Sequence, residues 1–546
     1  MADLIHLTAG RLLERTAELV PDHDAVVYPD RGLRYTYAEF DLLCRQTAKG
    51  LMKLGIQKGD HVAIWASNIP EWLAAQFATA KIGAVLVTIN TNFKIAELDY
   101  LLTHSDVSAL IIMESYRQTS YTDILNKLIP ELKHSDPGRL RSKRYPFLQT
   151  VLFIGDKSPP GMYQWDLLLE DAKSVKDEEL DGRMDSLEKD DCIHMQYTSG
   201  TTGFPKGVML SHFNIVNNAA NIAECMKLTS SDRLCIPVPF FHCFGCVLGV
   251  LACVSAGAAM IPIEQFSPET VLKTAEQEAC TALHGVPTMF IALLHDSRFS
   301  QYDLSHIRTG IMAGSACPAE VMKEVIGKMG MTDITIAYGQ TEASPVITQT
   351  RTDDSFKRRV ETAGRALPHI EIKIVRPGTS DEVPRGEQGE LCTRGYHVMK
   401  GYYKNEGATK EAIDTDGWLH TGDLAVMDED GYCRITGRLK DMLIRGGENI
   451  YPREIEELLY RHPAVADVQV VGVPDPKYGE EAAAWIRLKE GQTASEEDIK
   501  AYCKEKIARY KVPRYILFTD EYPMTASGKI QKFKLREKTM EELKLC

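Results

Sequence analysis

A glycine- and hydroxyl-rich loop around one lysine is the first candidate for chemistry in this sequence. The stretch from Tyr197 to His212 reads YTSGTTGFPKGVMLSH, with Lys206 between Pro205 and Gly207. Small residues let a backbone approach an anion closely, hydroxyls and N–H groups can surround its oxygens, and a lysine adds a point charge. The pattern therefore favours a polyphosphate site over an ordinary surface loop. Its candidate residues are Thr198, Ser199, Gly200, Thr201, Thr202, Gly203 and Lys206.

The loop differs from the phosphate loop of kinases and P-loop ATPases. Those enzymes need Gly-Lys followed by Ser or Thr, whereas Lys206 is followed by Gly207. The loop therefore cannot place a hydroxyl on a nucleotide-bound metal in the usual P-loop way. As a whole, the segment resembles the phosphate loop of adenylate-forming enzymes, a family that includes acyl-CoA synthetases, peptide-synthetase adenylation domains and luciferases.

A second candidate segment, residues 337–345, reads AYGQTEASP and begins where a predicted strand ends. Ligands of parallel sheets bind beyond the carboxyl ends of the strands. Glu342 is a carboxylate among small residues, and it suits Mg²⁺ when ATP phosphates supply further ligands. A helix-capping role for Thr341 and Glu342 is the alternative.

The same segment resembles the Tyr-Gly-x-Thr-Glu motif of the adenylate-forming family, with Tyr338 in the first place. The resemblance implies that Thr341 contacts the α-phosphate of ATP and that Glu342 binds Mg²⁺. It also implies an adenine pocket. The residues assigned to that pocket are Gly339 and Gln340, with Gly314, Ser315 and Ala316 at an earlier strand end.

A carboxylate and an arginine mark a third candidate element. Asp423 ends the run GWLHTGD, and Arg438 lies in the run GRLKD. A carboxylate in a tight turn can accept hydrogen bonds from both ribose hydroxyls, and an arginine can donate to the same sugar. Alone, Asp423 would be a turn residue and Arg438 a surface cation. The runs resemble the family's ribose site, which implies that both residues bind ribose and that Lys440 occupies the hinge position, where many members have Asp.

The last candidate for catalysis is Lys529, in the run PMTASGKI from Pro523 to Ile530. Without the other motifs, a lysine near a C-terminus would be a solvated side chain. The run resembles the family's catalytic-lysine motif. This implies that Lys529 bridges carboxylate and α-phosphate oxygens and stabilises negative charge as pyrophosphate leaves.

An apolar run with one histidine, FFHCFG, is the candidate acid-binding region. His242 is at the position of the family's aromatic gate between acid and nucleotide, and a buried core histidine is the alternative. Apolar neighbours favour a hydrophobic acid. These neighbours are Phe241, Cys243, Phe244, Val286 and Met289.

The run DMLIRGGENIYP, residues 441–452, resembles acyl-CoA synthetases in particular. Its glycines allow close backbone approach, and a glycine turn before a helix over residues 452–460 is compatible with the same role. The resemblance implies that the small domain rotates after adenylation. It further implies that Gly446, Gly447 and Glu448 then help to line the path of CoA.

The elements that must position these residues alternate between strand-like and helical patterns. Residues 60–65 and 84–89 are predicted strands, with a helix over 71–81 between them. Residues 281–286, 309–314 and 333–338 repeat the strand pattern. The alternation predicts α/β layers with largely parallel sheets, followed by a more antiparallel patch over 370–375 and 389–393.

Composition and charge limit the classes of protein. The 546 residues are 44% hydrophobic and 25% charged, which predicts a large folded enzyme. The net charge of −13 argues against broad nucleic-acid binding but leaves a local basic face open. Residues 133–145 are one basic run, for which a solvated loop is the favoured interpretation.

Three further sequence patterns indicate the cellular compartment in which the protein is expected. The 13 cysteines are scattered and suggest neither a zinc site nor a disulfide framework. The N-terminus has the spacing of an amphipathic helix rather than the layout of a signal peptide. The apolar stretch 243–263 is interpreted as a buried helix leading into a strand, not as a membrane span. We therefore expect a cytoplasmic protein with reduced thiols.

Together these patterns predict two domains, with the acyl and ATP sites in residues 1–439 and the lysine-bearing, mobile α/β domain in residues 440–546. The expected reaction joins a medium- or long-chain fatty acid to CoA through acyl-AMP, with ATP and Mg²⁺. Rival interpretations are an aryl or phenylpropanoid acid ligase, a ligase that loads a carrier protein, a luciferase-like oxidase, and a non-catalytic sensor. The presence of Lys529, Glu342 and Asp423 speaks against the sensor. Peripheral membrane association and a homodimer are left open, and no nucleic acid is expected.

Overall fold

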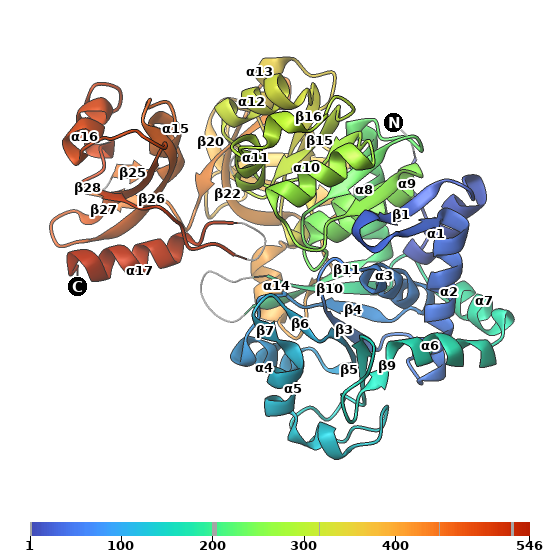
Figure 1. Cartoon of the computed structure of the whole chain (residues 1–546). Coiled ribbons are helices and arrows are strands. Elements are labelled where there is room, and N and C mark those ends of the chain that lie inside the picture. Colours follow the sequence, from blue (N-terminus) through green and yellow to red (C-terminus); the bar gives the residue numbers. More distant parts are fainter. Residues whose placement is uncertain (1–2, 199–204, 316, 447, 526–528, 546) are drawn as a thin grey trace.

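The computed structural model describes residues 3–198, 205–315, 317–446, 448–525 and 529–545 (Figure 1). Strands and helices alternate along most of the chain. The strands form two large mixed sheets, a four-stranded antiparallel sheet, a five-stranded C-terminal sheet and a small hairpin of β6 (Ser115–Tyr116) and β7 (Thr119–Ser120). The α/β class expected from the sequence is confirmed.

The first large sheet has eight strands, and the phosphate loop begins at the end of its strand β10. It is parallel from β10 to β9, and β11 and β21 add antiparallel strands beside β10. Its central strands are continuous apolar runs, as expected for a sheet that is covered on both faces. In sheet order the strands are β21 (Gly401–Tyr402), β11 (Lys206–Ser211), β10 (Cys192–Thr198), β4 (Val85–Thr88), β3 (His61–Trp65), β5 (Val107–Met113), β8 (Thr150–Ile154) and β9 (Tyr163–Gln164).

The second large sheet has nine strands and carries the predicted adenine and metal residues at its strand ends. It is parallel from β16 to β1, with antiparallel strands β17, β18 and β2 at its two edges. In sheet order the strands are β18 (Arg365–Ala366), β17 (Val346–Gln349), β16 (Asp333–Gly339), β15 (Thr309–Ala313), β14 (Ala282–Leu283), β12 (Arg233–Ile236), β13 (Ala259–Pro262), β1 (Asp24–Tyr28) and β2 (Leu33–Thr36).

One apolar core joins the two large sheets through the helices packed between them. Apolar residues of β3 and β4 from one sheet and of β1 and β12 from the other belong to the same buried cluster. In α3 (Pro70–Ile82) every residue except Glu71 is buried, because a helix that is apolar all round is stable only when it is covered all round. The predicted N-terminal amphipathic helix is α1 (Ala9–Leu19), and it packs into this core.

The remaining helices of the large part flank the sheets (Figure 1). They are α2 (Tyr37–Lys53), α4 (Ile95–His104), α5 (Tyr121–Leu128), α6 (Trp165–Asp171), α7 (Asp177–Asp185), α8 (His212–Met226), α9 (Ala252–Ala256), α10 (Pro268–Gln277), α11 (Pro287–Leu294), α12 (Ala319–Met329), α13 (Phe356–Glu361) and α14 (Glu406–Ala412). None of the helices that the structure describes combines the length and the apolar character needed to cross a bilayer.

The apolar stretch after His242 is helical and buried, as expected, but its first part is a π-helix, η4 (Phe244–Leu251). Two glycines permit the close packing of this helix. A Cβ on Gly245 would lie 2.3 Å from the carbonyl oxygen of Pro239, and one on Gly249 would lie 3.0 Å from the side chain of Ile236. The π-helix begins two residues after His242, in the predicted acid-binding region.

The last third of the chain forms two smaller sheets. The antiparallel sheet contains β19 (Ile370–Val375), β20 (Gln388–Gly395), β22 (Leu419–Met427) and β23 (Cys433–Arg438), where the sequence predicted an antiparallel patch. The C-terminal unit contains β24 (Leu443–Arg445), β25 (Glu448–Ile450), α15 (Pro452–Leu459), β26 (Val465–Asp475), β27 (Gly479–Leu488), α16 (Glu496–Lys504), β28 (Tyr515–Phe518) and α17 (Lys532–Leu543). It lies to one side of the large part (Figure 1). The division between residues 439 and 440 stays a prediction.

Candidate active site

The predicted ribose residues meet at the end of the antiparallel sheet. Asp423 of β22 lies directly opposite Arg438 of β23 in the strand pairing. The Arg438 Nε donates to Asp423 Oδ1 at 3.1 Å, and the hydroxyl of Tyr338, near the end of β16, donates to Asp423 Oδ2 at 2.7 Å. Burial raises the pKa of Asp423, and the charge of Arg438 opposes this rise. The Asp423 carboxylate is therefore held by hydrogen bonds from two sheets, from Arg438 on its own sheet and from Tyr338 on the nine-stranded sheet.

Asp423 lies inside β22 and not in the tight turn that the sequence predicted, because the strand continues through Thr421 and Gly422 with a bulge opposite Leu391. This bulged part of β22 depends on Glu390, a residue that the sequence motifs did not single out. Glu390 accepts a hydrogen bond from Gly422 N at 3.0 Å, and Thr421 Oγ1 accepts one from Asp423 N at 3.1 Å. Gly422 has φ +70°, a left-handed conformation that favours glycine. The sequence gives no local signal for Glu390, because its partner lies on another strand.

Glu390 also belongs to the cluster Glu390, Cys392 and His420, whose ligand atoms lie within 4.8 Å of one another. Metal binding would need the thiolate of Cys392. Burial raises the pKa of this thiol to about 12, although a bound metal ion would itself lower it. Glu390 is already bonded to Gly422 N and His420 Nδ1. We interpret the cluster as support for the bulged part of β22 that presents Asp423.

The predicted metal residue, Glu342, lies on the short 3-10 helix η6 (Thr341–Ala343) just after β16. Tyr402 of β21 donates its hydroxyl to Glu342 Oε1 at 2.8 Å. The Lys206 Nζ lies 4.6 Å from the centre of the same tyrosine ring, close enough for a cation–π interaction. Tyr402 thus links the two charged groups that the sequence assigned to the triphosphate and its metal. No sequence motif had indicated this tyrosine.

A tight loop holds Glu342 beside the end of β16. Gln340 N donates to Pro345 O at 2.9 Å, and the backbone of Met399 donates to Glu342 O at 2.9 Å. A Cβ on Gly339 would lie 1.8 Å from Pro345 O, so only glycine allows this closure. The loop geometry therefore explains why Gly339 precedes the Gln-Thr-Glu segment.

Lys529 comes from the C-terminal unit and reaches the large part. Its N–H donates to Thr525 Oγ1 at 3.0 Å, and Thr525 N donates back to Lys529 O at 2.7 Å, which closes the two ends of the segment. A Cβ on Gly314 would lie 3.4 Å from the Lys529 Cε. The side chain therefore extends over Gly314 at the end of β15, in the predicted adenine region.

The Lys529 ammonium lies among the charges of the site. Burial lowers its pKa below the ordinary lysine value, and Arg438 acts in the same direction. Asp423 and Glu342 act in the opposite direction and favour the charged form. The ammonium is therefore close enough to both carboxylates to interact with each of them electrostatically. Such a group can stabilise negative charge that develops between the ribose and metal residues.

His242 is a neutral hydrogen-bond donor beside Lys529. Burial and the nearby charge of Lys529 lower its pKa to about 3. Its Nδ1 accepts a hydrogen bond from Phe244 N at 3.1 Å, which assigns the ring proton to Nε2. A neutral imidazole at this position can separate the predicted acid-binding and nucleotide-binding regions without adding a charge to either of them.

Cys243 follows His242 and forms a C-x-x-C pair with Cys246. The Cys243 Sγ lies 3.9 Å from Thr341 Oγ1. Burial raises the pKa of Cys243 to about 11, so the thiol stays protonated and unreactive at neutral pH. The Cys243 side chain therefore acts as a small apolar group in the wall of the site. The other predicted acid-pocket residues are also buried: Phe241, Phe244, Val286 and Met289.

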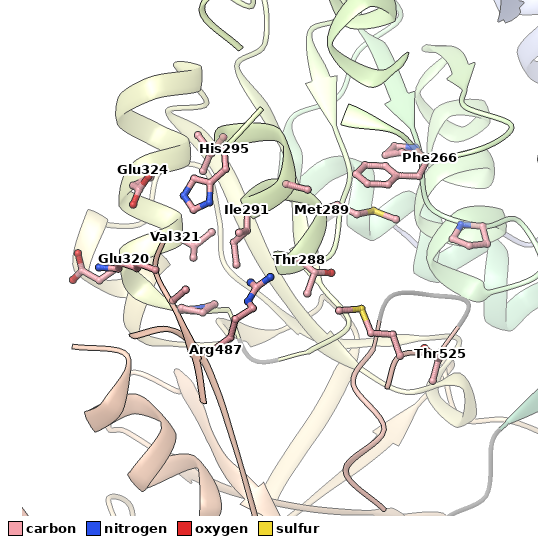
Figure 2. Close-up of a pocket in the computed structure, with 18 of the residues that line it drawn as sticks. Phe266, Thr288, Met289, Ile291, His295, Glu320, Val321, Glu324, Arg487 and Thr525 are labelled. Atoms are coloured by element: carbon pink, nitrogen blue, oxygen red, sulfur yellow. The ribbon is translucent and has the colours of Figure 1, made fainter. Parts of the chain in front are cut away.

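A cleft of about 1200 Å³ opens between the large part and the C-terminal unit (Figure 2). One side carries Met289 and Ile291 of α11, and the other carries Arg487 of β27. Thr525, which is hydrogen-bonded to Lys529, also lines it. The cleft therefore reaches the segment of the C-terminal unit that carries Lys529.

Several predicted residues are not part of this arrangement. Gly446, with φ +59°, and Glu448 lie at the β24–β25 hairpin, and Ser315 is exposed. Lys440 is also exposed, but it adjoins the site, because the backbone of its neighbour Leu439 donates to Gly422 O at 2.9 Å. Within the described residues, no hydrogen bond or ion pair joins Gly446 or Glu448 to the cluster around Lys529. Thr198 pairs with Lys206 at the base of the phosphate loop. The predicted residues that lie outside the described ones are Ser199, Gly200, Thr201, Thr202, Gly203, Ala316 and Gly447.

Comparison with family models and curated relatives gives matches along nearly the whole chain. A model of the AMP-binding enzymes matches residues 13–403, and a model of the AMP-binding enzyme C-terminal domain matches residues 454–529. YngI of Bacillus subtilis (strain 168), named provisionally as an acyl-CoA synthetase, is 75% identical over 545 residues, which are 100% of this chain and 99% of YngI. The mitochondrial medium-chain acyl-CoA ligase ACSF2 of Danio rerio is 44% identical over 98% of this chain and 89% of that protein.

Among solved structures, the anthranilate CoA ligase AuaEII in complex with anthranoyl-AMP matches with a TM-score of 0.86 and 28% identity. The match covers 100% of this chain and 99% of that chain.

Proposed function

The chain belongs to the family of AMP-binding, adenylate-forming enzymes, and from this premise we propose that its acid substrate is a medium- or long-chain fatty acid. It is an AMP-forming acid–thiol ligase that uses ATP and CoA. The single observation that carries the proposed roles is the position of Lys529, brought from the C-terminal unit to Gly314 and near Glu342 and Asp423.

In the first half-reaction, a carboxylate oxygen of the acid attacks the α-phosphorus of ATP. The bond from the α-phosphorus to the bridging oxygen breaks, and pyrophosphate leaves. Asp423 and Arg438 bind the ribose, and Lys206 offsets charge on the triphosphate. Lys529 orients the acid and stabilises the charge on the α-phosphate oxygens, an interaction that strengthens toward the transition state.

The donor set around Glu342 fits Mg²⁺. Carboxylate oxygens are hard ligands, and Mg²⁺ in nucleotide sites commonly uses one or two of them together with phosphate oxygens. Tyr402 holds Glu342 by one oxygen, which fixes the direction of the carboxylate. When bound, the ion would neutralise charge on the phosphates as pyrophosphate forms.

In the second half-reaction, the CoA thiol attacks the acyl carbonyl and AMP leaves. Lys529 has no assigned role in this step. We propose that the C-terminal unit turns about Lys440 between the two steps, withdraws Lys529, and brings Gly446, Gly447 and Glu448 to the path of CoA. The exposed side chain of Lys440, between the antiparallel sheet and the C-terminal unit, supports such a turn.

Apolar surroundings and the relatives support a fatty acid. Phe241, Cys243, Phe244, Val286 and Met289 are buried around or near the neutral His242, and none of them carries a charge that would select a polar acid. The ACSF2 relatives, named medium-chain acyl-CoA ligases, are 40–44% identical. An aryl acid is the second candidate, because AuaEII and an o-succinylbenzoate CoA synthetase of Bacillus subtilis have similar structures.

Pyrophosphate release with ATP, Mg²⁺ and a panel of acids tests this proposal. The panel runs from acetate to palmitate and includes benzoate and coumarate, each with and without CoA. We expect turnover to peak on a medium or long chain and to be sustained only with CoA. A peak on benzoate or coumarate would replace the fatty acid with an aryl acid. Turnover sustained without CoA would contradict the thiol acceptor.

A further inference from the structure

A basic segment, residues 133–149, stands out on a chain with a net charge of −13. It contains one carboxylate, Asp136. Its cations are Lys133, Arg139, Arg141, Lys143 and Arg144, and all of them are exposed. In Figure 1 the segment forms the teal turns at the lower edge of the large part, away from the C-terminal unit. None of its residues has a part in the reaction described above.

Buried side chains fix the conformation of the basic segment. Leu140, Tyr145 and Leu148 belong to the apolar core beneath it. The Leu140 N donates to Gln149 O at 2.9 Å, and Gln149 N donates to Ser108 O at 2.9 Å, which ties the segment to β5. Buried anchors alternate with exposed cations along the run. The fold therefore presents the cations outward.

Most cations of the basic segment form no ion pair within the described residues. Arg144 is bonded to Asp99, which also accepts a hydrogen bond from Tyr145 OH at 2.6 Å. The other four cations form no ion pair with a carboxylate within the described residues. By contrast, arginines such as Arg45 and Arg233 each contact two or more carboxylates. The four cations are thus available to an external anion.

An exposed aromatic side chain accompanies these cations. Phe147 is 55% exposed and follows the exposed Pro146. Cations beside an exposed aromatic ring are the combination that binds the interface of an anionic bilayer, where the cations meet headgroups and the ring enters the boundary of the acyl chains. We propose that the basic segment docks this enzyme on an anionic lipid bilayer.

The charge of the whole chain favours a bilayer over a polyanion that wraps around the protein. A planar membrane meets only one face, so the acidic remainder of the surface can point away from it. Each Lys or Arg near such a surface strengthens binding by about fivefold, and the attraction falls off within a Debye length. The proposal goes beyond the ligase reaction and does not depend on which acid the enzyme activates.

Co-sedimentation of the full chain with vesicles tests the proposal. The vesicles contain phosphatidylcholine alone or phosphatidylcholine mixed with phosphatidylglycerol. We expect binding to the mixed vesicles only, weakening as salt is raised. The triple variant Arg139→Glu, Arg141→Glu and Lys143→Glu should lose more than tenfold in affinity. The variant Phe147→Ser should bind more weakly than the wild type at every salt concentration.

A charge-matched variant tests whether vesicle binding depends on the basic segment itself or only on the net charge of the protein. It carries Lys357→Glu, Lys410→Glu and Lys504→Glu, three exposed lysines on α13, α14 and α16. It should bind vesicles better than the basic-segment variant does, and both should retain pyrophosphate release with a water-soluble acid. Equal loss of binding in both variants would overturn the proposal. Binding to a single-stranded oligonucleotide without binding to the mixed vesicles would also overturn it.

Discussion

Tyr402 holds the two charged groups of the proposed triphosphate site in one arrangement. Its hydroxyl is bonded to Glu342 and its ring lies under Lys206. The side chain is only 8% exposed, so water cannot easily replace the hydroxyl. A hydrogen bond to a charged group contributes about 1.5–3 kcal/mol. The orientation of Glu342 should therefore depend strongly on this tyrosine.

The substitution Tyr402→Phe should raise the KM for Mg²⁺–ATP by about tenfold, the lower end of that hydrogen-bond range. The measurement is the initial rate of pyrophosphate release as ATP and Mg²⁺ are varied. Tyr403→Phe is the matched control, because its hydroxyl is bonded to Asp106 instead. Similar kinetics for the two variants would show that Tyr402 does not position Glu342.

Single residues were predictable from the sequence where a motif surrounds them. Lys529, Glu342, Asp423 and Arg438 each stand in a short run with a chemical reason for its composition, and the structure brings them together. Tyr402 was not predictable, because a tyrosine on a two-residue edge strand has no local pattern. Its partners come from β11 and η6, which only the folded chain brings beside β21.

At the scale of elements, the loop after β16 depends on the absence of a side chain at Gly339. The substitution Gly339→Ala would place a Cβ against Pro345 O and open the loop that carries Thr341 and Glu342. We expect the ATP-dependent rise in the thermal unfolding midpoint to shrink strongly. Thermal unfolding with and without Mg²⁺–ATP measures it.

Gly327→Ala on α12 is the control for this substitution, because a Cβ there meets no atom within 4 Å. Alanine in a helix is about 1 kcal/mol more favourable than glycine, so this variant should be as stable as the wild type or more stable. A normal ATP-dependent shift in Gly339→Ala would contradict the role of the closed loop.

Elements were predicted well where the apolar pattern is long and less well where it is short. The strand predicted over 333–338 is β16, and the one over 370–375 is β19. The strand predicted over 281–286 contains only the two residues of β14, because Val286 already caps α11. The π-helix η4 was not predictable from apolar content, since its wider turns depend on packing against Pro239 and Ile236.

At the scale of the whole molecule, buried histidines should make the fold sensitive to acid. Burial lowers the pKa of His194 and His284 to about 4, and of His212 and His397 to about 3. In the unfolded chain these groups titrate near the ordinary value of about 6.5. As pH falls below about 6.5, protons bind the unfolded chain preferentially, so stability is lost between there and about pH 4.

The expected result is a steep fall in the free energy of unfolding over that range, to which each buried histidine contributes up to about 1.4 kcal/mol per pH unit. Denaturant titrations at a series of pH values measure it. His212→Asn should make the dependence shallower, whereas His306→Gln, at an exposed position, should leave it unchanged. An unchanged slope in His212→Asn would contradict the assignment of that histidine as buried and neutral.

The overall arrangement was predictable in outline. The order of the motifs indicated a large nucleotide-binding part followed by a lysine-bearing unit, and the C-terminal sheet forms such a unit after β23. The approach of Lys529 to Gly314 was expected only through the family resemblance. No local pattern could indicate it, because the two residues lie far apart in the sequence, Gly314 after β15 of the large part and Lys529 between β28 and α17 of the C-terminal unit.

The central claim is that Lys529 acts in adenylation and not in thiol transfer. The most direct test measures both half-reactions in Lys529→Ala: acid-dependent pyrophosphate release, and the attack of CoA on supplied acyl-AMP. Lys534→Ala, at an exposed position on α17, is the control. We predict a loss of about 100-fold or more in pyrophosphate release, with thiol transfer largely spared. Equal loss of both half-reactions, or normal pyrophosphate release, would contradict the account.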